Sequence, residues 1–297
     1  MCVLISCFDQ EQREFFSEQD PLFLGLNDEL VSCDFDSVQT TSLREARDEF
    51  SNLVTLYFDG RDFDYLSLSQ NSQMMNQLCQ IQKTYFEFDE GRLSKNQRAA
   101  FFINAYKISV ITLIASRFDE VLRPGFEDIP QNRSLLFIGD RGTRAFEEFK
   151  FPVANAYLSL DEIEFENLLP ENGPLIHFAL YRGARGFFEN YQTAFDENNL
   201  NERLDELANN YVNNITFFDD FEGEETVFTT EFIKLIQSSL RRDPENRFTD
   251  IRSFLAFYND PDFTGVESSD LFNRDDQNNF VWKLDFSTFI DWQLNEK

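Results

Sequence analysis

The sequence holds one histidine and four cysteines in 297 residues. A single histidine excludes a metal site built from several histidines, and the four cysteines include no C-x-x-C pair of the kind that binds zinc. Cysteines without a pattern in a chain of this length suit a reducing interior, where each is usually a small buried apolar residue. We therefore expect no metal ion and an intracellular, by default cytoplasmic, location.

Basic residues are also few, with 26 Lys and Arg against 54 Asp and Glu, a formal charge of −28. This charge repels phosphate backbones and anionic lipid head groups, which argues against nucleic acid or a membrane surface as a partner. No stretch approaches the roughly 18 apolar residues of a membrane span, and the start, MCVLISCFDQ, lacks the basic region of a secretory signal. The partner we expect is a protein with a basic face, such as a subunit of a larger assembly.

Glycine and proline are scarce, with 11 and 8 residues, so a long linker is excluded. The chain has no G-x-S-x-G nucleophile elbow, no G-K-[ST] phosphate loop and no alternating acidic calcium loop. The glycine pair at 139–142 is typical of a turn. We expect no cofactor.

Phenylalanine, in contrast, occurs 36 times. This number exceeds what one core of this size readily buries, so some rings can face a partner. A biased lineage composition explains the same excess equally well.

Helical signals follow an irregular lead over residues 1–41. Three capping boxes, in which a serine and an acidic or amide residue three positions later satisfy each other's backbone N–H, begin at Ser42, Ser94 and Ser159. The Ser94 box precedes the most apolar helix, whose one face carries Phe102 and Tyr106. A polar helix is expected to follow the Ser42 helix, through Met74, Leu78 and Ile81, and further helices are expected at 199–213, 230–240 and 250–258.

Strand signals are fewer. Short strands and loops are expected between 121 and 158, a strand at 175–180, and an extended end at 280–294. Regular strand–helix alternation is missing, which argues against a doubly wound sheet. The sequence predicts a mostly helical α+β fold with a small sheet, in a single domain over 42–297.

The lone histidine, His177, lies within the apolar run 175–180. A histidine with carboxylates nearby in sequence, such as Glu164, can act as a general base. The alternative is a core histidine whose ring nitrogens find backbone partners.

Four short blocks give the chain a resemblance to the domain of unknown function 547 family, over about 42–297. In order, they look like the family's A-F-W-I-N-x-Y helix, its S-L-x-x-I-E-H segment, its H-F-A-L-N-C-G-A-R-S-C-P block and its terminal D-W-x-L-N. They occupy residues 100–106, 159–164, 177–185 and 291–295.

Departures from the family pattern bear on function. Arg182 and Phe187 stand where the family has cysteines, and Phe165 where it has a histidine; Phe102 replaces a tryptophan and Lys107 an asparagine. A thiolate nucleophile cannot be replaced by guanidinium or phenyl. If the motif implies Cys/His chemistry, that chemistry is lost here.

The matching positions that remain resemble a scaffold: Asn104, Glu164, His177, Gly183 and Trp292. We expect His177, Glu164 and Asn104 to share one neighbourhood as a relic site, narrowed by phenylalanines, and the Ser94 helix to pack on 175–180. The resulting hypothesis is a non-catalytic pseudoenzyme, acting as an accessory or structural subunit through protein contacts. The alternative is a hydrolase or acyl-transfer enzyme that uses His177 with Glu164.

Overall fold

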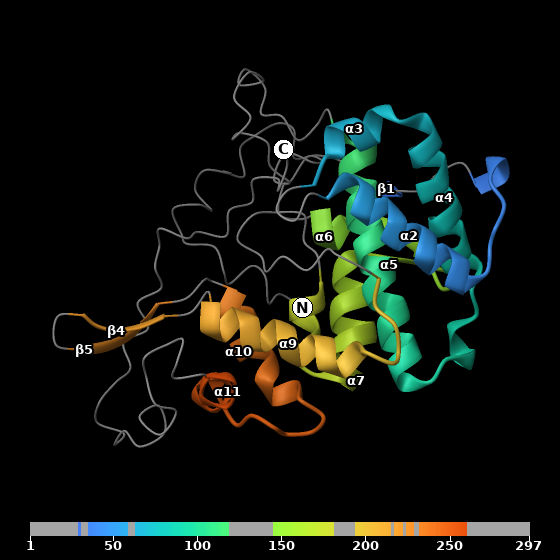
Figure 1. Cartoon of the computed structure of the whole chain (residues 1–297). Helices are drawn as coiled ribbons and strands as arrows, with labels where there is room; N and C mark the ends of the chain where they lie inside the picture. Colours follow the sequence, from blue (N-terminus) through green and yellow to red (C-terminus); the bar gives the residue numbers. More distant parts are fainter. Residues whose placement is uncertain are drawn as a thin grey trace, which may run out of the picture. The chain divides into compact units, whose positions relative to one another are not determined.

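The computed structural model of the chain describes residues 29–30, 35–58, 63–118, 145–180, 194–214, 217–221, 224–228 and 232–259 (Figure 1). Helices dominate and the sheets are small, so the predicted mostly helical α+β class is confirmed. The chain clusters into two compact units. The α5 unit contains the described residues of 17–168 and 180–200, and the α9 unit those of 169–179 and 201–291. The placement of 42–297 in one domain stays a prediction.

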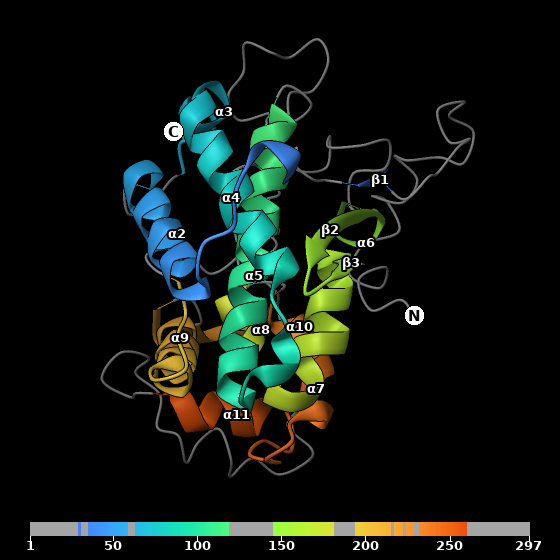
Figure 2. The ribbon, with the colours of Figure 1, turned by 90° about the vertical axis from the view of Figure 1, so that its right-hand side faces the viewer.

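Four α-helices form most of the α5 unit: α2 (Leu43–Tyr57), α3 (Tyr65–Gln70), α4 (Ser72–Glu87) and α5 (Lys95–Ser116). Short 3-10 turns, η3 (Phe35–Ser37) and η4 (Glu90–Arg92), precede α2 and α5. Helix α4 packs against α2, α5 and strand β2 (Phe149–Val153), and α3 packs against α5. Figure 2 shows α2 and the β strands on opposite sides of the α4–α5 pair.

The predicted capping boxes begin these helices. Ser42 caps α2, with Glu45 accepting from the Ser42 N–H at 3.0 Å. Gln97 accepts in the same way from the Ser94 N–H at 3.0 Å at the start of α5. Each bond satisfies a donor that the first helical turn would otherwise leave unpaired.

Helix α5 is the centre of its unit and is buried on every side. Every residue from Ala99 to Ala115 is buried, so the prediction of a single apolar face was too narrow. Contrary to the expectation that no apolar stretch is long enough for a membrane span, α5 could cross a membrane by length and composition, but 94% of its most apolar window is buried inside the protein. Such burial is what the core helix of a folded domain shows.

A small sheet covers the end of α4. Strand β2 follows the short helix α6 (Ala145–Glu148) in the chain. It pairs in parallel with β1 (Glu29–Leu30) and antiparallel with β3 (Ala156–Leu158). The β2–β3 turn has positive φ at Ala154 and Asn155, as a tight hairpin turn requires. The N–H groups of these two residues donate to the carbonyls of Tyr85 and Phe86, at 3.0 and 2.6 Å. The hairpin therefore satisfies carbonyls that the end of α4 would leave open.

The Ser159 capping box is also present, but it opens a π-helix. Glu162 accepts from the Ser159 N–H at 2.7 Å, and η9 (Glu162–Leu168) continues into α7 (Leu169–Asn172). The predicted short helix is thus confirmed, although capping alone does not determine its hydrogen-bond spacing.

The prediction of a strand at 175–180 was wrong. Residues Ile176–Ala179 form a helical turn, α8. Helix α7 ends at Gly173, which has a φ of +73° and donates its N–H to the Leu169 carbonyl. Pro174 then begins a new turn, in which the Pro174 carbonyl accepts from the His177 N–H at 3.2 Å. The run is buried on all sides, so apolar periodicity could not distinguish strand from helix.

The rest of the α9 unit contains the three helices expected late in the chain. They are α9 (Leu200–Asn214), α10 (Phe232–Ser239) with its 3-10 extension η10 (Leu240–Arg242), and α11 (Ile251–Tyr258). Strands β4 (Phe217–Phe221) and β5 (Glu224–Phe228) form an antiparallel hairpin. The α8 ring of Phe178 contacts Tyr211 of α9 and Phe254 of α11, at 5.3 and 6.0 Å between ring centroids. The extended end expected at 280–294 lies outside the described residues.

Cys79 departs from the cysteine expectation. It is half-buried on α4 and disulfide-bonded rather than a free apolar residue. The remaining cysteines, Cys2, Cys7 and Cys33, lie outside the described residues.

Candidate functional site

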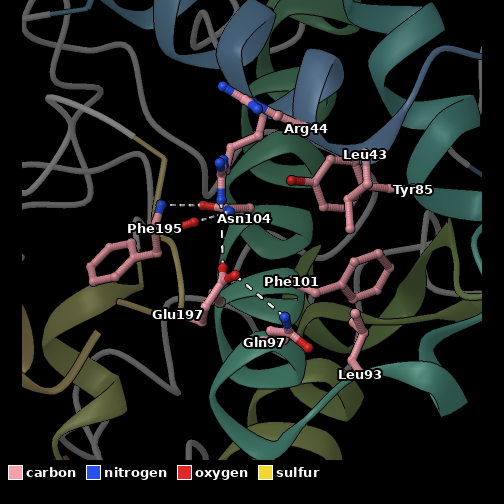
Figure 3. Close-up of a pocket in the computed structure, with 11 residues that line it drawn as sticks. Leu43, Arg44, Tyr85, Leu93, Gln97, Phe101, Asn104, Phe195 and Glu197 are labelled. Atoms are coloured by element: carbon pink, nitrogen blue, oxygen red, sulfur yellow. Dashed lines mark hydrogen bonds and ion pairs between the residues drawn. The ribbon is translucent and has the colours of Figure 1, made fainter. Parts of the chain in front are cut away.

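A cavity of about 230 Å³ opens in the α5 unit around Asn104 (Figure 3). Its walls come from α2, the end of α4, the turn before α5, the first half of α5, and the segment 194–200. The lining residues are Leu43, Arg44, Arg47, Tyr85, Leu93, Gln97, Ala100, Phe101, Asn104, Phe195 and Glu197.

The Asn104 side chain lines this cavity and forms hydrogen bonds with the main chain of Phe195. Its Nδ2 donates to the Phe195 carbonyl and its Oδ1 accepts from the Phe195 N–H, both at 2.8 Å. The side-chain amide thus forms the same pair of hydrogen bonds with Phe195, 91 positions away, that a neighbouring β-strand would form. Only asparagine or glutamine offers a donor and an acceptor side by side in this way, which explains the residue type on physical grounds. Asn104 is a positioning residue for segment 194–200.

Two further contacts fix the same segment. The Ala194 N–H donates to Ser51 Oγ at 3.1 Å. The Lys107 ammonium lies 4.6 Å from the centroid of the Phe195 ring, close enough for a cation–π contact. Lys107 is 3% exposed, so this contact lies inside the protein and helps to hold the wall of the cavity.

The mouth of the cavity is charged. Arg47 Nη1 lies 3.7 Å from Glu197 Oε2, and Gln97 Nε2 donates to Glu197 Oε1 at 3.3 Å. Arg44 is mostly exposed and lies 4.0 Å from Asp48. Two guanidinium groups and one carboxylate therefore line an opening in a chain of formal charge −28.

Tyr85 presents a neutral hydroxyl to the cavity. Its ring is buried and stacks on Phe101, with centroids 4.9 Å apart. Burial raises the pKa of Tyr85 far above its ordinary value, although a hydrogen bond with Asn104 and the charge of Arg47 act in the opposite direction. The phenol therefore stays protonated and can donate a hydrogen bond at any physiological pH.

The other two predicted site residues lie elsewhere. Glu164 is fully buried in η9 of the α5 unit, outside the cavity lining. His177 belongs to the α9 unit, so its proximity to Glu164 and Asn104, and the packing of α5 on 175–180, stay predictions. Phe165 is half-buried in η9, whereas Arg182, Gly183, Phe187 and Trp292 lie outside the described residues.

His177 has a partner that sequence reasoning missed. Its Nε2 lies 2.8 Å from Ser239 Oγ, at the end of α10. Both residues are buried, at 1% and 2% exposure. Ser239 lies 62 positions away and outside all four motif blocks, so no sequence signal links it to His177. The expected alternative, a core histidine, is close to what the α9 unit contains, but with a side-chain hydroxyl as partner.

Metal ligation has no site in the described part of the chain, where no three His, Cys, Asp or Glu side chains are grouped closely enough to hold an ion.

Part of the chain matches one known protein family. Residues 91–212 match the model of a family described as protein of unknown function, DUF547. This part of the chain resembles the DUF547 family. Three of the four motif blocks lie inside the DUF547 match, and the block at 291–295 lies beyond it. No curated protein and no solved structure matches the chain.

Proposed function

We propose that this chain is a pseudoenzyme that acts as an accessory or structural subunit through protein–protein contacts. The observation that carries the proposal is an open groove on the α9 unit. In this groove the ring of Phe257 is 64% exposed beside a row of carboxylates. A large exposed aromatic ring is a common anchor at protein interfaces.

Helix α9 supplies one wall of the groove, and the end of α11 supplies the other. The groove has a volume of about 810 Å³, and its α9 residues recur at the spacing of one helix face. The lining residues are Glu202, Asp205, Glu206, Asn209, Asn210, Phe257 and Tyr258.

The carboxylates in this groove differ in how they are engaged. Asp205 accepts from the Tyr258 hydroxyl at 2.5 Å and lies 3.8 Å from Arg247. Glu202 and Glu206 form no ion pair within the part of the chain that the structure describes. Two such carboxylates next to an aromatic ring favour an arginine- or lysine-bearing surface, because a guanidinium can pair with a carboxylate and stack on a ring.

The environment of His177 supports a non-catalytic role. A general base must reach its substrate, whereas His177 and Ser239 are almost fully buried. The positions at which the family has cysteines are Arg182 and Phe187.

The test compares capture of a partner from the native source by the wild-type full chain and four variants of it. Phe257→Ser and Glu206→Lys should each reduce recovery of the partner at least about fivefold. The matched controls are Leu56→Ser, at a residue of 66% exposure on α2, and Glu166→Lys on η9, and both should leave recovery unchanged. Recovery should also fall as salt rises, since the attraction is screened. Equal losses in the controls, or recovery chiefly of nucleic acid, would count against the proposal.

A second candidate function is acyl transfer or hydrolysis. The 2.8 Å contact between Ser239 Oγ and His177 Nε2 is the distance that a nucleophile and its general base require, and it favours Ser239 as the nucleophile. In this alternative a serine-directed fluorophosphonate labels Ser239, and small-ester turnover is lost in His177→Ala with folding intact. This alternative uses Glu164 together with His177, so Glu164→Gln should also reduce the turnover of the small ester. The leading proposal expects no labelling and no turnover.

The intracellular location stays a prediction, and Cys79 offers its test. Disulfides persist chiefly in oxidising compartments. Alkylation of protein taken from its native source, before reduction, should modify Cys79 if the protein resides in a reducing interior. A protected Cys79 would contradict that location.

A further inference from the structure

Arginine lines the Asn104 cavity in a protein that is acidic overall, with a formal charge of −28. Of the two arginines in the lining, Arg44 is highly exposed and lies 4.0 Å from Asp48, whereas Arg47 is only 28% exposed and has Glu197 as its acidic neighbour. A guanidinium at the mouth of a partly enclosed site attracts small anions.

A carboxylate of the protein itself, that of Glu197, already lies at the mouth of the cavity. Its carboxylate takes a hydrogen bond from Gln97 and lies opposite Arg47. At 3.7 Å, however, the Arg47–Glu197 separation is longer than the 2.7–2.9 Å typical of a charge-assisted hydrogen bond. The side chain of Glu197 is also 37% exposed, so it can leave Arg47 for water at small cost.

The cavity also has apolar walls. Leu43, Leu93 and Phe101 line it, and the hydroxyl of Tyr85 points toward the side of Asn104 (Figure 3). A volume of about 230 Å³ corresponds to roughly eight water molecules. A nucleotide is too large for this space, whereas a carboxylate on a ring or a short branched chain fits.

We propose that this cavity binds a small free carboxylate with a compact apolar body. The ligand carboxylate takes the place of Glu197 at Arg47, and its body lies against Phe101 and Leu93. Glu197 is then a built-in competitor for the site. The cavity belongs to the α5 unit alone, and the proposal does not depend on the groove of the α9 unit.

Benzoate and its uncharged analogue benzamide probe this site on the full chain by isothermal titration calorimetry. We expect benzoate to bind and benzamide to bind at least about tenfold more weakly, since only benzoate pairs with the guanidinium. Absence of benzoate binding to both the wild-type protein and Glu197→Gln at millimolar concentration would overturn the proposal. Equal affinity for the two probes would do the same.

Variants then locate the binding. Arg47→Gln should weaken the Kd for benzoate about tenfold or more, and Glu197→Gln should tighten it severalfold by removing the competing carboxylate. Arg92→Gln, at an exposed arginine on η4, is the matched control and should leave the Kd unchanged. If Arg47→Gln does not fold, Arg47→Lys keeps the charge, loses the planar fork and should weaken the Kd by a smaller factor. Unchanged affinity in the Arg47 variant, or weaker affinity in Glu197→Gln, refutes the assignment.

Discussion

Asn104 and His177 are buried to the same extent, at 1% exposure, but their surroundings differ. In the α5 unit, Asn104 pairs with the main chain of Phe195 and holds a segment that forms the wall of a cavity. In the α9 unit, the His177 ring contacts the Ser239 hydroxyl, and the ring of the next residue, Phe178, packs on Tyr211. The Asn104 amide binds backbone, so it fixes the path of segment 194–200, and a cavity remains beside it. The His177–Ser239 pair joins two side chains that are both buried in the core of the α9 unit.

The largest effect is expected at Asn104. Asn104→Ala removes both hydrogen bonds that the Asn104 amide forms with the buried N–H and carbonyl of Phe195, so we expect a loss of about 2–4 kcal/mol in the free energy of unfolding. Asn76→Ala, the same change at an exposed position on α4, should cost under about 0.5 kcal/mol. Urea unfolding with unchanged slope measures both. Equal effects would remove the distinction between Asn104 and an ordinary helix residue.

Gly173 comes next, because it shapes the turn that leads to His177. A Cβ at this position would lie 2.9 Å from Asp243 Oδ1 and 3.0 Å from Pro244 Cδ, at a φ of +73°. Gly173→Ala should therefore cost about 2 kcal/mol or more. The control is Gly91→Ala, whose nearest contact is 3.3 Å and whose φ is not positive. The melting temperature should fall clearly for Gly173→Ala and little for Gly91→Ala.

Ser239→Ala tests the His177 side of the comparison. It leaves the buried Nε2 of His177 without its hydroxyl partner, which should cost about 1–2 kcal/mol. Ser238→Ala removes a hydroxyl that only donates to the Leu235 carbonyl one turn earlier, and it should cost less. If the neighbouring serine proves more important, the closed Ser239–His177 pair does not stabilise this core.

Gln82 is a buried side-chain amide like Asn104, but among the described residues it lacks the hydrogen bonds that Asn104 forms. It is 2% exposed, and neither amide atom has a hydrogen-bond partner in the part of the chain that the structure describes. Gln82→Met should raise the free energy of unfolding by about 1 kcal/mol, since it removes an uncompensated polar group. Gln73→Met, at an exposed position on the same helix, should change it little. A loss of stability at Gln82 would show that its amide is satisfied.

The smallest effect concerns pH and Glu162. Partial burial raises the pKa of this carboxyl. The hydrogen bonds from Lys150, at 2.8 Å, and from Ser159 lower the pKa by a larger amount, so the net shift is downward. A carboxyl with a lowered pKa in the folded protein stabilises the fold above its unfolded pKa, and the contribution is lost as pH falls through the folded pKa. Glu162→Gln should therefore cost less than about 1 kcal/mol near pH 7 and less still near pH 3, measured by urea unfolding. A cost that is the same at both pH values would contradict the assignment.

Local structure was largely predictable from neighbouring residues. The boxes at Ser42, Ser94 and Ser159, and the late helices α9, α10 and α11, depend on contacts within a few positions, and each was found. The strand prediction at 175–180 failed, because a run buried on every side has no polar face to reveal its period.

The acidic charge, the helix starts, the DUF547-like blocks and the choice of Asn104 and His177 as residues of interest all follow from the order of the residues. The contacts of these two residues depend on the folded chain. Phe195 and Ser239 lie 91 and 62 positions away from them, and hydrogen bonds across such separations leave no local pattern. The physical reason is that a buried polar atom needs a partner near it in space, and the folded chain determines which residue is there.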